Sequence, residues 1–167
     1  AQCSITFGAP SKTFNIEGIV SSYSIIPNDE IRNRFYTWLA ANELNEAPMF
    51  SPIATIAAFK NGEQWRKAML HYVEQNFIFM EEYCKTHLPK IKPLRPEASF
   101  LVWLDCRALG LNHEQLIDLF VNKAHLALND GEMFGKGGAG FMRVNVGTPR
   151  AILTKAFEQL TEAVAGI

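Results

Sequence analysis

The sequence predicts an α/β fold whose second half forms an α+β small domain, because predicted strands alternate with predicted packed helices. Three segments carry this prediction: a long helical repeat at 63–88 and two strand-like runs at 98–105 and 141–146. The chain has 167 residues, of which 48% are hydrophobic. A chain of this size buries about 70% of its unfolded surface, which is enough for one real core.

The beginning of the chain predicts two short strands, at residues 3–8 and 21–26, on either side of a turn. Polar and apolar residues alternate from Cys3 to Phe7, and Gly8 and Pro10 then interrupt the strand pattern. Ser11 and Lys12 follow on this turn.

Two helices are expected next. Asn28 is a suitable N-cap, and Asp29 and Glu30 in the first turn complement the helix dipole. A shorter helical segment is expected at about 52–60, and Asn61-Gly62 ends it.

Residues 63–88 form the longest periodic segment, and Pro89 stops it. The pattern favours a stripe that packs into the core over a face that binds a partner. The stripe comprises Trp65, Ala68, Met69, Tyr72, Asn76, Phe79, Met80, Tyr83 and Leu88.

The segment 98–105 is expected to be a strand that is buried on both sides, because both of its faces are apolar. Asn112 and Gln115 predict a capping box at the start of the next helix. The second strand, at about 141–146, follows a glycine-rich loop. Thr148-Pro149 begins a last helix with one apolar side.

Lys12 is the first candidate for chemistry. An amine that a turn holds at the end of a strand can condense with a carbonyl, provided that its surroundings favour the uncharged form. Without further context, a Ser-Lys pair on a turn is a solvated surface lysine.

The string Ser11-Lys12-Thr13-Phe14-Asn15-Ile16-Glu17-Gly18-Ile19 resembles the Schiff-base lysine segment of pyridoxal-phosphate enzymes. It is most similar to the cystathionine β-lyase-like branch of the class I/II aminotransferase family. Residues 21–28 resemble the strand that follows the lysine in this family. Residues 127–131 and 140–150 resemble its substrate-carboxylate segment.

The resemblance implies the C-terminal half of an aspartate-aminotransferase-like fold. Residues 1–28 would be a remnant of the large cofactor-binding domain, 29–62 a helical connector and 63–167 the small domain. The chain opens on Ala1 and is much shorter than the members of the family. The cofactor-stacking aromatic residue, the aspartate on the pyridine nitrogen and most of the phosphate cradle belong to their first half. We therefore expect a fragment that is inactive alone.

The resemblance also implies pyridoxal 5′-phosphate as the cofactor, with Lys12 as the catalytic lysine that carries it. Ser11 would contact the phosphate, or it merely caps the turn. The family often has a hydroxyl residue three positions before the lysine, where this chain has Ala9. This departure weakens the expected phosphate cradle.

Arg143 is the second candidate, because an arginine inside a β-rich run is costly unless a partner pairs with it. From the residues alone, a structural salt bridge to Asp105 or Asp130 explains it. The resemblance implies instead that the forked guanidinium binds the substrate α-carboxylate. Arg150 is expected on a helix surface.

The loop Gly135 to Gly140 matches the pattern G-x-G-x-x-G. The dinucleotide-binding fingerprint needs a helix after this loop, whereas a strand is expected here, so we reject nucleotide binding. The glycines indicate a mobile loop that closes over substrate, or a flexible connection.

Charge and composition bear on partners and compartment. Sixteen basic and seventeen acidic residues give a net charge of −1, which offers no electrostatic case for nucleic acid. No targeting signal or bilayer-long apolar run is visible. Cys3, Cys84 and Cys106 are scattered and odd in number, which favours a reducing cytoplasm.

No metal site is expected. Cys84 and His87 could share a helix face, but no second pair completes a site, so packing is the better account. The other histidines, His71, His113 and His125, show no ligand spacing either.

The resemblance therefore implies a C–S β-lyase that acts on a small amino-acid substrate and gives thiol, pyruvate and ammonia. An aminotransferase with the same lysine and arginine is the first alternative. A non-catalytic domain or assembly module is the second. We expect a homodimer of the full-length enzyme, with neither nucleic acid nor a membrane as partner.

Overall fold

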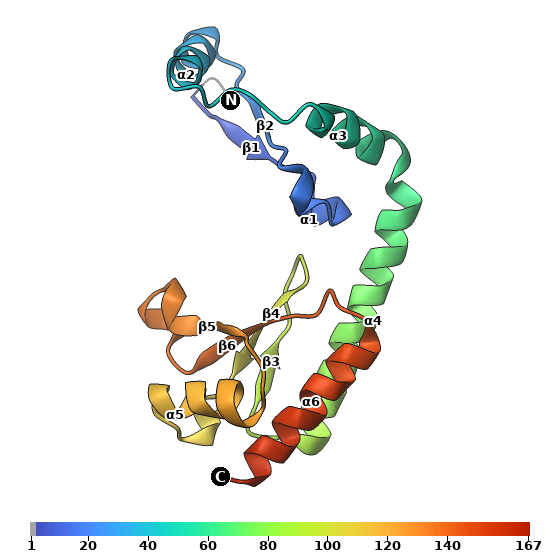
Figure 1. The fold of residues 1–167 in the computed structure, drawn as a ribbon, viewed down its shortest axis with the longest axis vertical. Coiled ribbons are helices and arrows are strands. Elements are labelled where there is room, and N and C mark those ends of the chain that lie inside the picture. The colour runs from blue at the N-terminus through green and yellow to red at the C-terminus, as the bar shows by residue number, and fades with distance from the viewer. Residues whose placement is uncertain (1–2) are drawn as a thin grey trace. The chain divides into compact units, whose positions relative to one another are not determined.

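The computed structural model describes residues 3–167, which form two compact units (Figure 1). The first unit ends at Met69 and the second runs from Leu70 to Ile167. The helices are α1 (Ser11–Phe14), α2 (Asp29–Ala41), α3 (Phe50–Asn61), α4 (Glu63–His87), α5 (His113–Asp118) and α6 (Arg150–Ala165). The strands are β1 (Thr6–Gly8), β2 (Tyr23–Ile25), β3 (Lys92–Leu94), β4 (Leu101–Asp105), β5 (Asn129–Asp130) and β6 (Phe141–Asn145). The predicted boundaries after residues 28 and 62 stay a prediction.

The first unit contains a two-stranded antiparallel sheet of β1 and β2. Gly8 lies opposite Tyr23, and a Cβ atom at residue 8 would come within 2.4 Å of the tyrosine ring. A larger residue at this end of β1 would therefore require the Tyr23 ring to move. Both predicted strands are confirmed, although each is shorter than its predicted range.

The predicted helix starts of the first unit are largely confirmed. The Asn28 side chain accepts a hydrogen bond from the Ile31 amide at 2.9 Å, which caps α2. Helix α3 begins at Phe50, two residues before the predicted start, and Gly62 follows its last residue as predicted.

The second unit is a four-stranded antiparallel sheet in the order β3-β4-β6-β5. Val102, Leu104, Met142 and Val144 are buried on one face of this sheet. They share one core cluster with residues of α4, α5 and α6, so all three helices cover the same face. Helices α4 and α6 run side by side, and the Tyr83 and Phe157 rings pack 5.8 Å apart (Figure 1).

The prediction that both faces of the 98–105 strand are buried is wrong for the second face. Leu101 and Trp103 are only half-buried, because the three helices all pack on the opposite face. Strands β3 and β5 were not predicted. Each has three residues or fewer, and β3 contains Pro93, so neither shows a strand pattern in the sequence.

The stripe predicted for α4 is correct only in its C-terminal part. Asn76, Met80 and Leu88 are buried, whereas Trp65 and Tyr72 are each 46% exposed. The core of the second unit contacts α4 only beyond the first turns of the helix. The apolar periodicity of the sequence extends over the whole helix, so it predicts more buried residues than the structure shows.

Arg150 is not the simple helix-surface residue that was predicted. Its Nε donates a hydrogen bond to the Asn76 side-chain oxygen at 2.8 Å, and its guanidinium lies 4.6 Å from the centre of the Phe79 ring. The fully buried Asn76 side chain also donates to the carbonyls of Val146 and Thr148, both at 2.8 Å. Asn76 thus joins α4 to the segment between β6 and α6.

The capping box predicted at α5 is confirmed. The Asn112 side chain accepts from the Gln115 amide at 2.9 Å, and the Gln115 side chain accepts from the Asn112 amide at 3.0 Å. Within residues 3–167, no helix is both long and apolar enough to cross a membrane.

Candidate functional site

Lys12 lies in α1, a single helical turn that follows β1 directly, whereas the sequence indicated a simple turn. Phe14 anchors this turn. Its buried ring packs edge-on against Phe59 of α3 at 5.3 Å, and a Cβ atom at Gly62 would come within 2.8 Å of it. The Lys12 side chain itself is 60% exposed, so the backbone is fixed while the amine is accessible.

The Lys12 amine forms an ion pair with Glu17, and Nζ donates to Oε1 at 2.9 Å. The hydrogen bond from Lys12 lowers the pKa of the Glu17 carboxyl. Both side chains face water, and exposed pairs of this kind are weak and exchange easily. This partner therefore holds the amine in place but does not bury it.

Helix α3 also supports the segment after Lys12. The Ser51 hydroxyl, which is buried, donates to the Ile19 carbonyl, and the hydroxyls of Ser21 and Thr55 lie 2.7 Å apart. Val20 between them has φ +51°, a left-handed conformation that a β-branched residue rarely adopts. Side chains of α3 thus support the segment that follows Lys12, in addition to its own helical turns.

Ser11 is the half-buried first residue of α1, and its carbonyl accepts the Ile16 amide at 3.0 Å. This bond closes the turn around Lys12 through the Ser11 backbone. Whether the Ser11 hydroxyl binds a phosphate stays a prediction.

Arg143 lies in the middle of β6, on the sheet face that the helices do not cover. The register places Leu94 opposite Trp103, Trp103 opposite Arg143 and Arg143 opposite Asn129. These four side chains form a row across all four strands, because directly opposite residues share a face. We call it the arginine row.

The guanidinium of Arg143 contacts uncharged groups. Nη2 donates to Oδ1 of Asn129 at 3.0 Å. The guanidinium carbon lies 4.4 Å from the centre of the Phe134 ring and 6.0 Å from that of Trp103. Nε is buried and has no hydrogen-bond partner among residues 3–167.

The alternative of a structural salt bridge for Arg143 is wrong. Asp105 is bound by Arg107, whose Nη2 and Nε donate to the two carboxylate oxygens at 2.7 and 2.9 Å. The same hydrogen bonds hold the pKa of Asp105 below its usual range. Asp130 lies 3.6 Å from Nε2 of His113. Among the residues that the structure describes, Arg143 has no carboxylate partner.

The glycine-rich segment before β6 consists of two 3₁₀ turns, Gly131–Phe134 and Lys136–Gly138. Its ends meet closely, and a Cβ atom at Gly138 would lie 1.9 Å from the Gly131 carbonyl oxygen. A strand, β6, follows this segment as predicted, so the helix that dinucleotide binding requires does not occur there. The segment instead places Phe134 on the Arg143 guanidinium.

Next to this contact is a shallow cavity of about 340 Å³. It is lined by Leu94, Trp103, Phe134, Gly137, Gly138 and Phe141. Asn129 and Phe134 are the contacts of Arg143 that sequence reasoning missed. Residue 129 lies in the 127–131 segment of the family resemblance, but nothing in the sequence pairs it or Phe134 with Arg143, because strand register and loop geometry bring them together.

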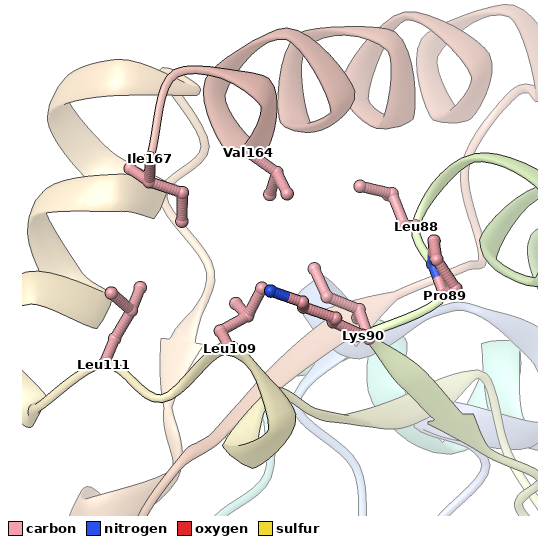
Figure 2. Close-up of a pocket in the computed structure, with 8 residues that line it drawn as sticks. Leu88, Pro89, Lys90, Leu109, Leu111, Val164 and Ile167 are labelled. Carbon is pink, nitrogen blue, oxygen red and sulfur yellow. The ribbon is translucent and has the colours of Figure 1, made fainter.

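A second pocket, of about 260 Å³, lies at the opposite face of the sheet, between the end of α4 and the end of α6 (Figure 2). Its walls are apolar side chains and Lys90. The apolar side chains are those of Leu88, Pro89, Ile91, Leu109, Leu111, Val164 and Ile167. Over residues 3–167, no cluster of three or more His, Cys, Asp or Glu side chains is placed to hold a metal ion.

Comparison with known proteins places this geometry in context. No protein-family model matches the sequence. Cystathionine beta-lyase PatB of Bacillus subtilis is 38% identical over 165 residues, which are 99% of this chain and 43% of PatB. The chain thus spans less than half the length of the curated relatives it matches.

Solved structures give the same picture. A PLP-bound putative aminotransferase from Clostridium difficile 630 has a TM-score of 0.94 at 37% identity, over 98% of this chain and 42% of that one. Cystalysin from Treponema denticola, whose structure contains pyridoxal 5′-phosphate, has a TM-score of 0.92 at 30% identity, over 99% and 42%.

Proposed function

We propose that this chain carries the catalytic lysine and the carboxylate-binding arginine of a C–S β-lyase. The chain belongs to the cystathionine β-lyase-like branch of fold-type I pyridoxal-phosphate enzymes and corresponds to their C-terminal part. The observation that carries the proposal is Arg143. Its guanidinium is half-buried, positioned by a neutral amide and without a carboxylate partner among the described residues. A forked cation in this state is suited to bind the carboxylate of an amino acid.

Lys12 and Ser11 would hold pyridoxal phosphate, Lys12 through its amine and Ser11 through its hydroxyl. The Lys12 side chain is 60% exposed and pairs with the exposed carboxylate of Glu17, so its amine is accessible, which fits this role. When bound, the cofactor supplies an electron sink for the charge that develops at the substrate α-carbon. The remaining contacts to the cofactor would come from the part of the enzyme outside this chain.

Lys12 would act as the base, with Nζ taking the proton from the substrate α-carbon. A fixed backbone with a long, accessible side chain suits this work, because the amine has to reach both Glu17 and the substrate. Arg143 would orient the substrate by binding both carboxylate oxygens, so that the α-hydrogen faces the amine.

The proposed reaction breaks the Cβ–S bond of an S-substituted cysteine such as cystathionine. With one water, it gives a thiol, pyruvate and ammonia. The names of the relatives, cystathionine beta-lyase among them, support this choice. An aminotransferase is the second candidate, supported by the Clostridium difficile structure. Both reactions begin with the same proton removal, so Lys12 and Arg143 would serve either.

Thiol release separates the two candidates. The full-length enzyme is supplied with pyridoxal phosphate and an S-alkyl cysteine, with and without a 2-oxo acid. Release of thiol and pyruvate in the absence of the 2-oxo acid supports the lyase. A strict requirement for the 2-oxo acid would identify an aminotransferase.

The isolated chain would be inactive, because it supplies the proposed catalytic lysine but only part of the cofactor site. As a separate module it could serve assembly alone, which is the non-catalytic alternative. We also propose a homodimer for the full-length enzyme, acting in the cytoplasm on a small-molecule amino-acid substrate and with no nucleic-acid or membrane partner.

A further inference from the structure

Arg143 is held by a neutral residue, although the neighbouring strands β4 and β5 each contain an aspartate. Asp105, the nearest alternative on β4, is bound by Arg107 through two hydrogen bonds. Asp130, next to Asn129 in β5, lies opposite Met142 and therefore on the other face of the sheet from Arg143. Its carboxylate lies 3.6 Å from Nε2 of His113 and accepts the Glu132 amide at 3.0 Å. The aspartates of the two neighbouring strands are thus bound to other groups, and it is the neutral Asn129 that contacts the arginine.

The neutral partner has a physical consequence. An amide oxygen fixes the orientation of the guanidinium through a hydrogen bond but leaves its positive charge uncompensated. A carboxylate at the same place would form the same bond and neutralise the charge. The other contacts of Arg143, the rings of Phe134 and Trp103, are also uncharged.

We propose that Asn129 is a positioning residue, which orients the Arg143 fork and, by being neutral, keeps its charge available for the substrate carboxylate. This inference rests on the proposed function, since it deepens the carboxylate role of Arg143. Asn129 does not touch the substrate. It acts through the hydrogen bond between its Oδ1 and Nη2 of Arg143.

The competing explanation is a structural one, in which Asn129 merely joins β5 to β6. The two explanations differ for one substitution. In Asn129→Asp the side chain has the same shape and still accepts the bond from Nη2, so a structural role would be preserved. The positioning role would be damaged, because the new carboxylate competes with the substrate for the guanidinium.

The test uses the full-length enzyme with pyridoxal phosphate and two substrates, an S-alkyl cysteine and its α-amide, which lacks the anionic carboxylate. The ratio of the two kcat/KM values measures the preference for the carboxylate. The variants are Asn129→Asp, Asn129→Ala and Arg143→Lys. Asn112→Asp is the control, since it adds the same charge to the same unit and keeps its own hydrogen bond to the Gln115 amide.

We expect Asn129→Asp to lower the ratio of kcat/KM for the acid to kcat/KM for the amide roughly 10-fold or more. This is the change in binding expected when one charge-assisted hydrogen bond to the substrate is lost. The change should come from a higher KM for the acid, with the amide unaffected. Asn129→Ala should lower the ratio less, through lost orientation, and Asn112→Asp should leave it unchanged. Asn129 is exposed on an edge strand, so both variants should fold, and thermal unfolding checks this.

An Asn129→Asp ratio equal to that of the unmodified enzyme would overturn the inference while leaving the proposed function intact, provided that Arg143→Lys lowers the ratio. A ratio that Arg143→Lys does not change would overturn both, because Arg143 would then not bind the carboxylate.

Discussion

Asn129 of β5 lies directly opposite Arg143 of β6, and its side-chain oxygen accepts a hydrogen bond from Nη2 of that arginine at 3.0 Å. The antiparallel register brings the two residues together, although they are 14 positions apart in the sequence. A guanidinium that is fixed by an amide keeps both its geometry and its charge. The proposed carboxylate site on the outer face of the sheet rests on this pair.

Replacement of Arg143 by lysine should raise KM for an amino-acid substrate roughly 10- to 100-fold in the full-length enzyme. Lysine keeps the charge but loses the fork that matches two carboxylate oxygens. Steady-state kinetics measures this effect, and Arg66→Lys on the exposed part of α4 is the matched control. An unchanged KM would show that the fork of Arg143 is not used for binding.

The isolated 167-residue chain should not hold pyridoxal phosphate at Lys12. Its Lys12 amine is 60% exposed, and the chain spans only 43% of the PatB relative. Borohydride reduction followed by peptide mass spectrometry should find scattered, non-saturable labelling of lysines. Saturable labelling of Lys12 that a Lys12→Ala chain loses would contradict this prediction.

Asn76→Ala should lower the free energy of unfolding of the chain by about 2–4 kcal/mol. The substitution leaves the Val146 and Thr148 carbonyls without their donor and the Arg150 Nε without its acceptor. Urea unfolding followed by circular dichroism measures the change. The control is Asn122→Ala, whose exposed side chain donates a hydrogen bond to Oδ1 of Asp118 at 2.8 Å. Equal urea midpoints for the two variants would show that the buried hydrogen bonds of Asn76 do not stabilise the fold.

The cysteines make a prediction about pH. Burial raises the pKa of the Cys84 and Cys106 thiols to about 12, from an ordinary value of 9.0. The folded chain therefore holds protons that the unfolded chain releases above about pH 9. The contribution of these two protonated thiols to the free energy of unfolding is fully present below pH 9. It is lost as the pH rises from 9 toward 12, so the folded chain becomes less stable over this range.

Thiol labelling tests the same environment more directly. At pH 8 a disulfide reagent should modify the exposed Cys3 alone, and all three cysteines should react in denaturant. Cys3→Ser should abolish labelling of the folded chain. Rapid modification of Cys84 in the folded chain would show that its environment is not the closed core described above.

Elements with a strong local signal could be predicted from the sequence. The Asn28 cap, the Asn112–Gln115 capping box and the strand at about 141–146 all depend on near neighbours, and all three are confirmed. The α/β class followed from the same signals.

The remaining features depend on long-range contacts. Arg150 was placed on the surface because its bond to Asn76 joins residues 74 positions apart. Asn129 and Phe134 were missed for the same reason, since register and the close approach of Gly131 to Gly138 bring them to Arg143. The roles of Lys12, Ser11 and Arg143 came from the family resemblance and stay proposals.

The most direct test of the account is cystathionine cleavage by the full-length enzyme with pyridoxal phosphate, measured as thiol and pyruvate release beside a Lys12→Ala variant. We predict release of both products without any added 2-oxo acid, and its loss in the variant. Release that persists in Lys12→Ala would contradict the central role of Lys12. Amino transfer to a 2-oxo acid without thiol release would contradict the lyase.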